Sequence, residues 1–481
     1  FIFFKIFGLS LLLLKPCKMN FKLCFKFLIQ ALTPFQYRTY YQSRVKKPTL
    51  YTILSPLGDP NSSLFPELDR WVKNGNKVCV AELQRIIRDF RKQKRFQQAL
   101  EVSQWMNQTG TCLFSTVEHA VHLDLIGRVN GFSLAEQYFE ILREKDKNEK
   151  TYGALLNCYV RQLQVDKSIS HFTKMKQLGL ATSALPFNNI MSLYTNLNQH
   201  EKVVTLLNDM KENNVEPDNC TYRICINSYG VRSDIEGMET VLNEMNQCEG
   251  IVLDWNTYTI VANFYIKAGL IEKAISALQR AEERLETKDG IGYNHLMSLY
   301  AILGDKYEVM RVWNGQKNAC TRHINRDYIT MLESLVKLGA LKEAEGVLCE
   351  WKRSGNAYDV RIPNVVVVGY CKMGFFEEAE EILEGLMKSG KATTPNSWGI
   401  VAQGFVERGE MRKALHCIKM ATFVYKEGRG WKPNLRIVKT IMEWLLVEGN
   451  EDVEKLASEF RKIFPLKVHA FAAIAAKNKR Q

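Results

Sequence analysis

The stretch 184–218 carries two amphipathic helical patterns, one after the other, within 35 residues. Apolar side chains recur at the three- and four-residue spacing of one helix face at Phe187, Ile190, Met191 and Tyr194, then at Val203, Leu206, Leu207 and Met210. The stretch therefore predicts a helical hairpin. Because a single hairpin leaves its apolar faces exposed, the pattern is expected to recur in neighbouring stretches.

This pattern returns at steps of 35 residues, with one step of 36, over most of the chain. The aromatics in phase with Phe187 are Tyr152, Tyr222, Tyr258, Tyr293, Tyr328 and Trp398. Glycines able to take the positive φ that ends a helix are Gly269, Gly304, Gly339, Gly374 and Gly409. Small residues expected where the two helices approach most closely are Ala274, Ala344, Ala379 and Ala414, with Val309 in the gap.

Acidic residues precede the first helix of several units and are expected to cap its N-terminus: Asp218, Asp254, Asp289 and Asp359. Taken together, the repeated features predict an all-α fold. The expected architecture is an α-solenoid, a right-handed superhelix of about 10–11 helical hairpins of ~35 residues each.

Four regions are expected along the chain. Residues 1–47 form an upstream and targeting segment, 48–77 a lead-in with a short helix, 78–460 the hairpin array, and 461–481 a basic tail. Met19 is the expected translation start. From Met19 onward the segment is acid-free, basic and interleaved with apolar residues, which is typical of a mitochondrial presequence. Its poverty in serine argues against the alternative, a chloroplast transit peptide.

The net charge of +13 comes from the two ends of the chain. Residues 1–58 contain nine Lys and Arg and no acid, and the segment after Glu459 adds six more. The stretch 59–460 carries 50 basic and 52 acidic residues. A cationic surface on the array must therefore come from local clustering. One such cluster, a candidate for phosphate contacts, is Arg85, Arg88, Arg91, Lys92, Lys94 and Arg95; a solvated helix and turn is the alternative.

Signals for catalysis or metal binding are sparse. The 12 cysteines form no CxxC pair and are expected to be reduced core residues. No HExxH, phosphate-binding glycine loop, nucleophile elbow or HxE…CxxC deaminase signature occurs. The sequence therefore predicts a protein that is not an enzyme, with no cofactor, metal, small-molecule substrate or membrane association.

Several motifs resemble the pentatricopeptide repeats of the P-type class found in plant organelles. They are the starts Thr151-Tyr152, Thr221-Tyr222 and Thr257-Tyr258, the ending LNDMKENNVEPD, and the G-x-x-x-x-A turns. The lead-in also resembles that of a mitochondrial subgroup. The resemblance covers roughly residues 50–460. It implies a helical-repeat fold and, as partner, single-stranded RNA of an organelle.

In that family a repeat reads one base through the fifth residue of its first helix and the last residue of the repeat. By this resemblance, Asn188 with Asp218 is a candidate reader of uridine, and Thr259 with Asp289 of guanosine. The other pairs depart from the pattern: Gly153 with Ser183, Arg223 with Asp254, Asn294 with Ile324, Ile329 with Asp359, Asn364 with Thr394 and Gly399 with Asn434. Among these, Arg223, Asp254, Asn294 and Asn364 are weaker candidates, and Ile324 offers Asn294 no polar partner.

Three functions remain open. The first is an RNA-binding factor in mitochondrial transcript processing, stability or translation. The second is a structural or assembly component of a ribonucleoprotein such as the mitochondrial ribosome, with ribosomal or other ribonucleoprotein proteins as partners. The third is a protein-binding helical-repeat scaffold. The alternative interpretation of the base-reading pairs is that they are helix caps and solvated polar positions inherited from the repeat.

Overall fold

The computed structural model describes residues 49–58, 62–110, 113–425, 431, 433–448 and 458. These fall into two compact units that divide after Leu113. The expected targeting segment 1–47 and basic tail 461–481 lie outside the described residues. So does all but one residue of the second helix of the last expected hairpin, 435–460.

The described part of the first unit contains the helices α2 (Leu50–Leu54), α3 (Phe65–Lys73), α4 (Val80–Lys92) and α5 (Phe96–Gln108). The expected short helix of the lead-in is α3. Helices α4 and α5 form a hairpin, but α5 also packs against α3. Glu101 of α5 accepts the Leu64 N–H at 2.7 Å, and the Trp105 indole donates to Asp69 at 2.8 Å. The first hairpin and the lead-in therefore belong to one compact unit, within which these bonds join them.

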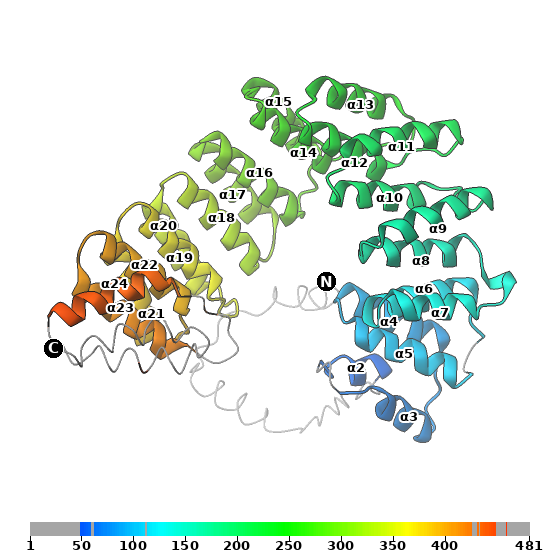
Figure 1. Ribbon diagram of the computed structural model, residues 1–481, viewed down its shortest axis with the longest axis horizontal. Coiled ribbons are helices and arrows are strands. Elements are labelled where there is room, and N and C mark those ends of the chain that lie inside the picture. The colour runs from blue at the N-terminus through cyan, green and yellow to red at the C-terminus, as the bar shows by residue number, and fades with distance from the viewer. Residues whose placement is uncertain are drawn as a thin grey trace, which may run out of the picture. The chain divides into compact units, whose positions relative to one another are not determined.

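The second unit is a succession of helical hairpins (Figure 1). Their first helices are α6 (Thr116–Val129), α8 (Glu149–Arg161), α10 (Ala184–Asn196), α12 (Asn219–Val231), α14 (Trp255–Lys267), α16 (Gly290–Leu303), α18 (Asn325–Lys337), α20 (Arg361–Lys372), α22 (Pro395–Glu407) and α24 (Leu435–Val447). Their second helices are α7 (Phe132–Glu140), α9 (Val165–Gln177), α11 (His200–Glu212), α13 (Ile235–Gln247), α15 (Ile271–Glu283), α17 (Lys306–Ala319), α19 (Leu341–Arg353), α21 (Phe376–Lys388) and α23 (Met411–Val424). A 3-10 turn, η1 (Glu144–Asp146), precedes α8.

Contacts between helices of this unit follow one rule. Each first helix packs against the next first helix, and each second helix packs against its own first helix and the following one. The first helices therefore form a continuous row, which we call the first-helix layer, and Figure 1 shows α8, α10 and α12 as neighbours in it. This arrangement confirms the α-solenoid expected from the 35-residue period.

The turn and packing positions also behave as expected. Gly269, Gly304, Gly339, Gly374 and Gly409 all have positive φ, between 70° and 82°. The corresponding residues of earlier hairpins, Leu163, Asn198 and Ser233, also adopt positive φ although they carry side chains. Ala274, Ala344, Ala379 and Ala414 are fully buried. The turn geometry is thus a property of the hairpin, and glycine is the residue that adopts it without strain.

Cysteines follow the expectation only in part. Among the described cysteines, which are all free, Cys158, Cys225 and Cys417 are buried, but Cys79, Cys220 and Cys349 are exposed. Cys79 is the N-cap of α4, Cys220 is the second residue of α12 and Cys349 lies in α19, and their exposure shows that a core role for these three is wrong.

Candidate nucleic-acid interface

The two residues of each candidate reading pair lie at the junction between successive first helices. The fifth residue of a first helix is, for example, Asn188 in α10 and Thr259 in α14. The last residue of the repeat is the N-cap of the next first helix, as Asp218 is for α12. Since first helices stack directly on one another, this cap is brought close to the preceding fifth residue.

Asn188 is held by the N-terminus of α12 through both ends of its amide. Its Nδ2 donates to Oδ1 of Asp218 at 3.0 Å, and its Oδ1 accepts the hydroxyl of Thr221 at 2.8 Å. The same Asp218 oxygen accepts the backbone N–H of Thr221 at 2.8 Å and lies 2.9 Å from its hydroxyl, whose single hydrogen is shared between this oxygen and Asn188 Oδ1. The amide of Asn188 therefore has one orientation and keeps one N–H for another partner.

This network also changes the acidity of the cap. Burial by itself would raise the pKa of Asp218, but the hydrogen bonds donated by Thr221 and Asn188 outweigh it and lower the pKa below its usual value. Asp218 is therefore a carboxylate at neutral pH and can only accept hydrogen bonds.

The second predicted pair is not brought together in this way. The Thr259 hydroxyl donates to the backbone oxygen of Asn256 at 2.9 Å. The Asp289 carboxylate caps α16, accepting the N–H groups of Ile291 and Gly292 at 3.0 and 3.3 Å. Within the described residues no hydrogen bond joins Thr259 to Asp289. Both lie at the α14–α16 junction, but their polar groups are used locally.

Arg223 and Asp254 form an ion pair across the α12–α14 junction, with Nη1 and Oδ2 2.7 Å apart. The other carboxylate oxygen of Asp254 accepts the backbone N–H and the hydroxyl of Thr257 at 2.9 and 2.8 Å. Asp254 is thus a cap, as expected, and a fixed partner for the guanidinium. Arg223 keeps further N–H donors with which it could contact a base or a phosphate.

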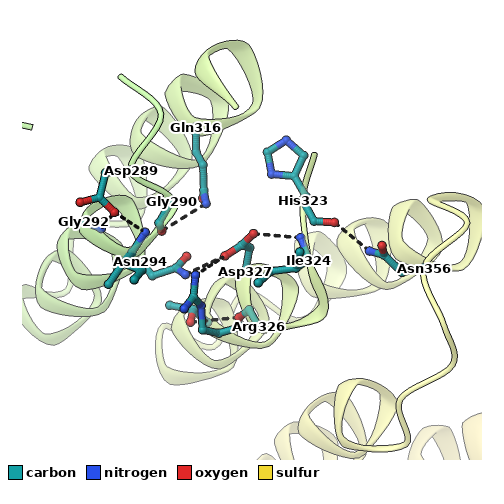
Figure 2. A network of polar contacts seen from close by, with 12 residues as sticks. Asp289, Gly290, Gly292, Asn294, Gln316, His323, Ile324, Arg326, Asp327 and Asn356 are labelled. Atoms are coloured by element: carbon teal, nitrogen blue, oxygen red, sulfur yellow. Dashed lines mark hydrogen bonds and ion pairs between the residues drawn. The ribbon is translucent and has the colours of Figure 1, made fainter. Parts of the chain in front are cut away.

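The α16–α18 junction corrects one expectation. Ile324 does offer no polar side chain, but Asn294 nevertheless has a partner, because its Nδ2 donates to Oδ1 of Asp327 at 2.8 Å (Figure 2). Asp327 is the third residue of α18, and its Oδ2 accepts the N–H of Ile324 at 3.0 Å. The carboxylate therefore comes from three residues beyond the position used in the other pairs.

Asn364 has a similar partner at the α20–α22 junction. Its Oδ1 accepts the hydroxyl of Ser397 at 2.7 Å, while Thr394 caps α22 and lies 2.6 Å from the same hydroxyl. The cap expected at Asp359 is shifted, because Val360 is the N-cap of α20. The Asp359 carboxylate instead pairs with Arg361, which also donates its backbone N–H.

Sequence reasoning missed Thr221, Asp327 and Ser397. Each is the third residue of a first helix and contacts the candidate reading asparagine of the preceding first helix. A signal was present, since a hydroxyl or acid three residues after a helix start is the second half of a capping box. The same side chain serves as cap and as partner to the candidate reader.

Two hollows open on the first-helix layer at these junctions. One, with a volume of about 1000 Å³, is lined by Ile329 and Asn364, by the cations Lys337, Arg361 and Lys372, and by the acid Glu333. The other, of about 200 Å³, contains Gly399 and Asn434. These hollows place Ile329, Asn364 and the pair Gly399 and Asn434 next to open surface, and in the larger one the cations outnumber the acid.

The candidate phosphate cluster is divided by the structure. Arg85, Arg88, Lys92 and Lys94 are exposed on α4 and the turn after it, and Arg91 is partly covered. Arg95 instead donates to the backbone oxygens of Ser55 and Leu57 at 2.8 and 2.5 Å, and lies over the Phe90 ring. Arg95 therefore has a structural role, while the exposed members remain candidates.

One grouping in the described residues has metal-ligand chemistry: Glu380 and Glu384 of α21 with His416 of α23. The imidazole Nε2 lies 3.9 and 3.6 Å from the two carboxylates, and Glu384 also pairs with Lys388. The group lies on second helices, away from the reading positions. In addition, no helix among the described residues is long and apolar enough to span a membrane.

Comparisons with known proteins agree with the motifs. Models of the PPR repeat match residues 150–180, 220–249, 256–284, 327–356 and 362–390, and a PPR repeat family model matches residues 183–231. In Arabidopsis thaliana, the pentatricopeptide repeat-containing protein At4g21705, mitochondrial, is 53% identical over 92% of this chain and 90% of its own. The protein At2g20710, mitochondrial, is 36% identical over 86% of this chain and 84% of its own.

Among solved structures, the pentatricopeptide repeat protein PPR10 from maize is similar in fold, with a TM-score of 0.58 at 16% identity. The match covers 85% of this chain and 61% of the maize chain. The mitochondrial relatives confirm the localisation expected from the sequence. With 53% identity to At4g21705 over nearly the whole of both chains, this chain belongs to the pentatricopeptide repeat family.

Proposed function

We propose that this chain is a mitochondrial RNA-binding protein that holds single-stranded RNA along its first-helix layer and acts in transcript processing, stability or translation. The observation that carries the proposal is the α10–α12 junction. There the Asn188 amide is fixed by Asp218 and Thr221 and keeps an N–H donor. A donor held in one orientation at a repeat junction is the group needed to select among bases.

Further observations support RNA as the ligand. The same maize protein PPR10 has been crystallised in complex with an 18-nt psaJ RNA element, and its fold matches 90% of this chain with a TM-score of 0.54. The hollow between α18 and α20 combines cations with the Asn364 amide. Cations next to base-contacting groups are the usual composition of a single-strand binding surface.

A second candidate function is a structural part of a ribonucleoprotein. The observation that favours it is that three fifth positions, Gly153, Ile329 and Gly399, cannot donate or accept a side-chain hydrogen bond. Because each base contact contributes about 1–3 kcal/mol of discrimination, few readers give a short recognition sequence. A solenoid that contacts ribosomal RNA and proteins needs no base code. A protein-binding scaffold is the third candidate.

We also propose that the chain acts by binding and is not an enzyme. The sequence holds none of the catalytic signatures sought, including the deaminase motif HxE…CxxC. Occupying an RNA segment is sufficient to block a nuclease or to open a structured region, so the proposed role needs no chemical step.

The test is crosslinking of the tagged full chain to RNA in isolated plant mitochondria, followed by sequencing of the recovered RNA. The proposal predicts one or a few messenger or precursor segments, with recovery reduced by Asn188→Ala. Thr195→Ala is the matched control, because among the described residues its hydroxyl bonds only the Met191 carbonyl of the same helix.

Recovery of ribosomal RNA alone would contradict transcript-specific action and support the second candidate. No recovery, together with no RNA affinity of the purified chain at low salt, would contradict RNA binding and support the scaffold.

A further inference from the structure

Three candidate reading asparagines have a partner 33 residues later in the chain. Thr221 contacts Asn188, Asp327 contacts Asn294 and Ser397 contacts Asn364. The partner is in each case the third residue of the next first helix. The position is therefore structurally equivalent at the three junctions, and only its chemistry differs.

At two junctions the partner is a hydroxyl that donates. Thr221 and Ser397 each donate to the Oδ1 of the asparagine, at 2.8 and 2.7 Å. The amide oxygen is thus occupied, and the groups left for a ligand are N–H donors.

At the third junction the partner is a carboxylate, which cannot donate. Asp327 therefore accepts from the Nδ2 of Asn294, and the amide is turned the other way (Figure 2). Asn294 Oδ1 is buried and has no hydrogen-bond partner among the described residues. Asn188 and Asn294 are equally covered, each with 6% of its surface exposed, so their difference lies in orientation.

We propose that the third residue of the following first helix sets the hydrogen-bonding polarity of the reading asparagine, and that Asp327 leaves Asn294 with a free acceptor oxygen in addition to its second N–H. This inference rests on the proposed function, RNA binding along the first-helix layer. Asp327 is a positioning residue, because it acts on the base through Asn294. A buried carbonyl oxygen without a donor is rare in folded proteins, and the amino group of a base would supply the donor.

The proposal assigns different bases to the junctions. An amide that offers N–H donors suits uracil, whose O4 and O2 are acceptors. An amide that offers its oxygen suits bases with an exocyclic amino group, which is N4 of cytosine, N6 of adenine or N2 of guanine. Asn188 and Asn364 should therefore favour uracil, and Asn294 should favour a base that carries an amino group.

The experiment is selection of bound sequences from a random single-stranded RNA pool by the purified full chain, comparing variants at position 327. Asp327→Thr reproduces the arrangement of Thr221, and its hydroxyl can still accept the N–H of residue 324, so the helix start is kept. We expect one position of the selected motif to change from an amino-bearing base to uracil, by about tenfold in relative affinity.

A reciprocal variant controls for general damage. Ser397→Asp places a carboxylate beside Asn364 and should shift the motif position read by Asn364 from uracil to an amino-bearing base, leaving the others unchanged. Thermal unfolding of both variants verifies that the array is folded.

The outcomes separate this inference from the function on which it rests. A wild-type motif that Asn294→Ala alters but Asp327→Thr and Ser397→Asp leave unchanged would overturn the positioning role. A wild-type chain that binds no RNA from the pool would overturn the proposed function, and the inference with it.

Discussion

Asn188→Ala is expected to weaken the start of the next repeat as well as the reading position. The substitution removes two hydrogen bonds, from Nδ2 to Asp218 at 3.0 Å and from Thr221 to Oδ1 at 2.8 Å. Each contributes about 1 kcal/mol net. Asp218 and Thr221 keep their bonds to each other, so no charged group is left unpaired, and the better helix propensity of alanine returns about 0.5 kcal/mol.

The expected loss is therefore about 1–2 kcal/mol, concentrated at the α10–α12 junction. Hydrogen exchange is the suitable assay, since unfolding of a repeat array need not be a single step and exchange reports each segment separately. Amides in the first turn of α12 should exchange about 5- to 30-fold faster in the variant, whereas those of α20 and α22 should not change.

A double-mutant cycle tests the reasoning behind this magnitude. Thr221→Val removes the hydroxyl that donates to Asn188, so part of the loss caused by Asn188→Ala should disappear in that background. We expect a coupling of about 0.5–1.5 kcal/mol. Additive effects of the two substitutions would refute the claim that these side chains act as one network. Thr195→Ala on the same helix face provides the uncoupled control.

Three further outcomes are expected. Leu163→Gly should raise the free energy of unfolding by about 1 kcal/mol, because Leu163 has a φ of 53°, in the left-handed region that glycine adopts without strain. A lower free energy of unfolding in urea denaturation would refute this. Gly404→Ala should cost about 1–3 kcal/mol, since its Cβ would lie 2.1 Å from Phe376, whereas Gly153→Ala, with no atom within 4 Å, should be neutral or stabilising; equal melting temperatures would contradict the difference. Burial lowers the pKa of His122 to about 4, so stability should fall between pH 6.5 and 4 by up to about 1.4 kcal/mol per pH unit. His122→Phe should make this fall shallower, and an unchanged pH profile would exclude His122 as its source.

The hairpins could be predicted from the sequence because their determinants are local. Amphipathic spacing determines which helix face is buried. Gly269 marks the turn between the two helices of a hairpin, and Ala274 marks the position where these helices approach most closely. Leu163 shows the limit of the residue-by-residue argument, since stacking imposes the same turn on a residue that disfavours it. The packing of α5 against the lead-in was not predictable, because the hydrogen bonds of Glu101 and Trp105 join residues that are far apart in the sequence.

The candidate readers were predictable by position but their partners were not. The rule that pairs the fifth residue of a first helix with the last residue of the repeat gave Asn294 the partner Ile324. In the structure, the stacking of α18 on α16 brings Asp327 to Asn294 instead. Conversely, Thr259 and Asp289 match the expected pattern but use their polar groups within their own helices. Which of several nearby side chains completes a junction depends on the rotation between successive first helices, which the period alone does not specify.

The central claim is that RNA lies on the first-helix layer, and mapping of crosslinked peptides tests it most directly. The purified full chain would be irradiated with a single-stranded RNA containing 4-thiouridine, and the attached peptides identified by mass spectrometry. The account predicts attachment on α10, α14, α16 and α20, around residues 188, 259, 294 and 364. Attachment only on second helices, or only within the basic segments 1–58 and 461–480, would contradict it.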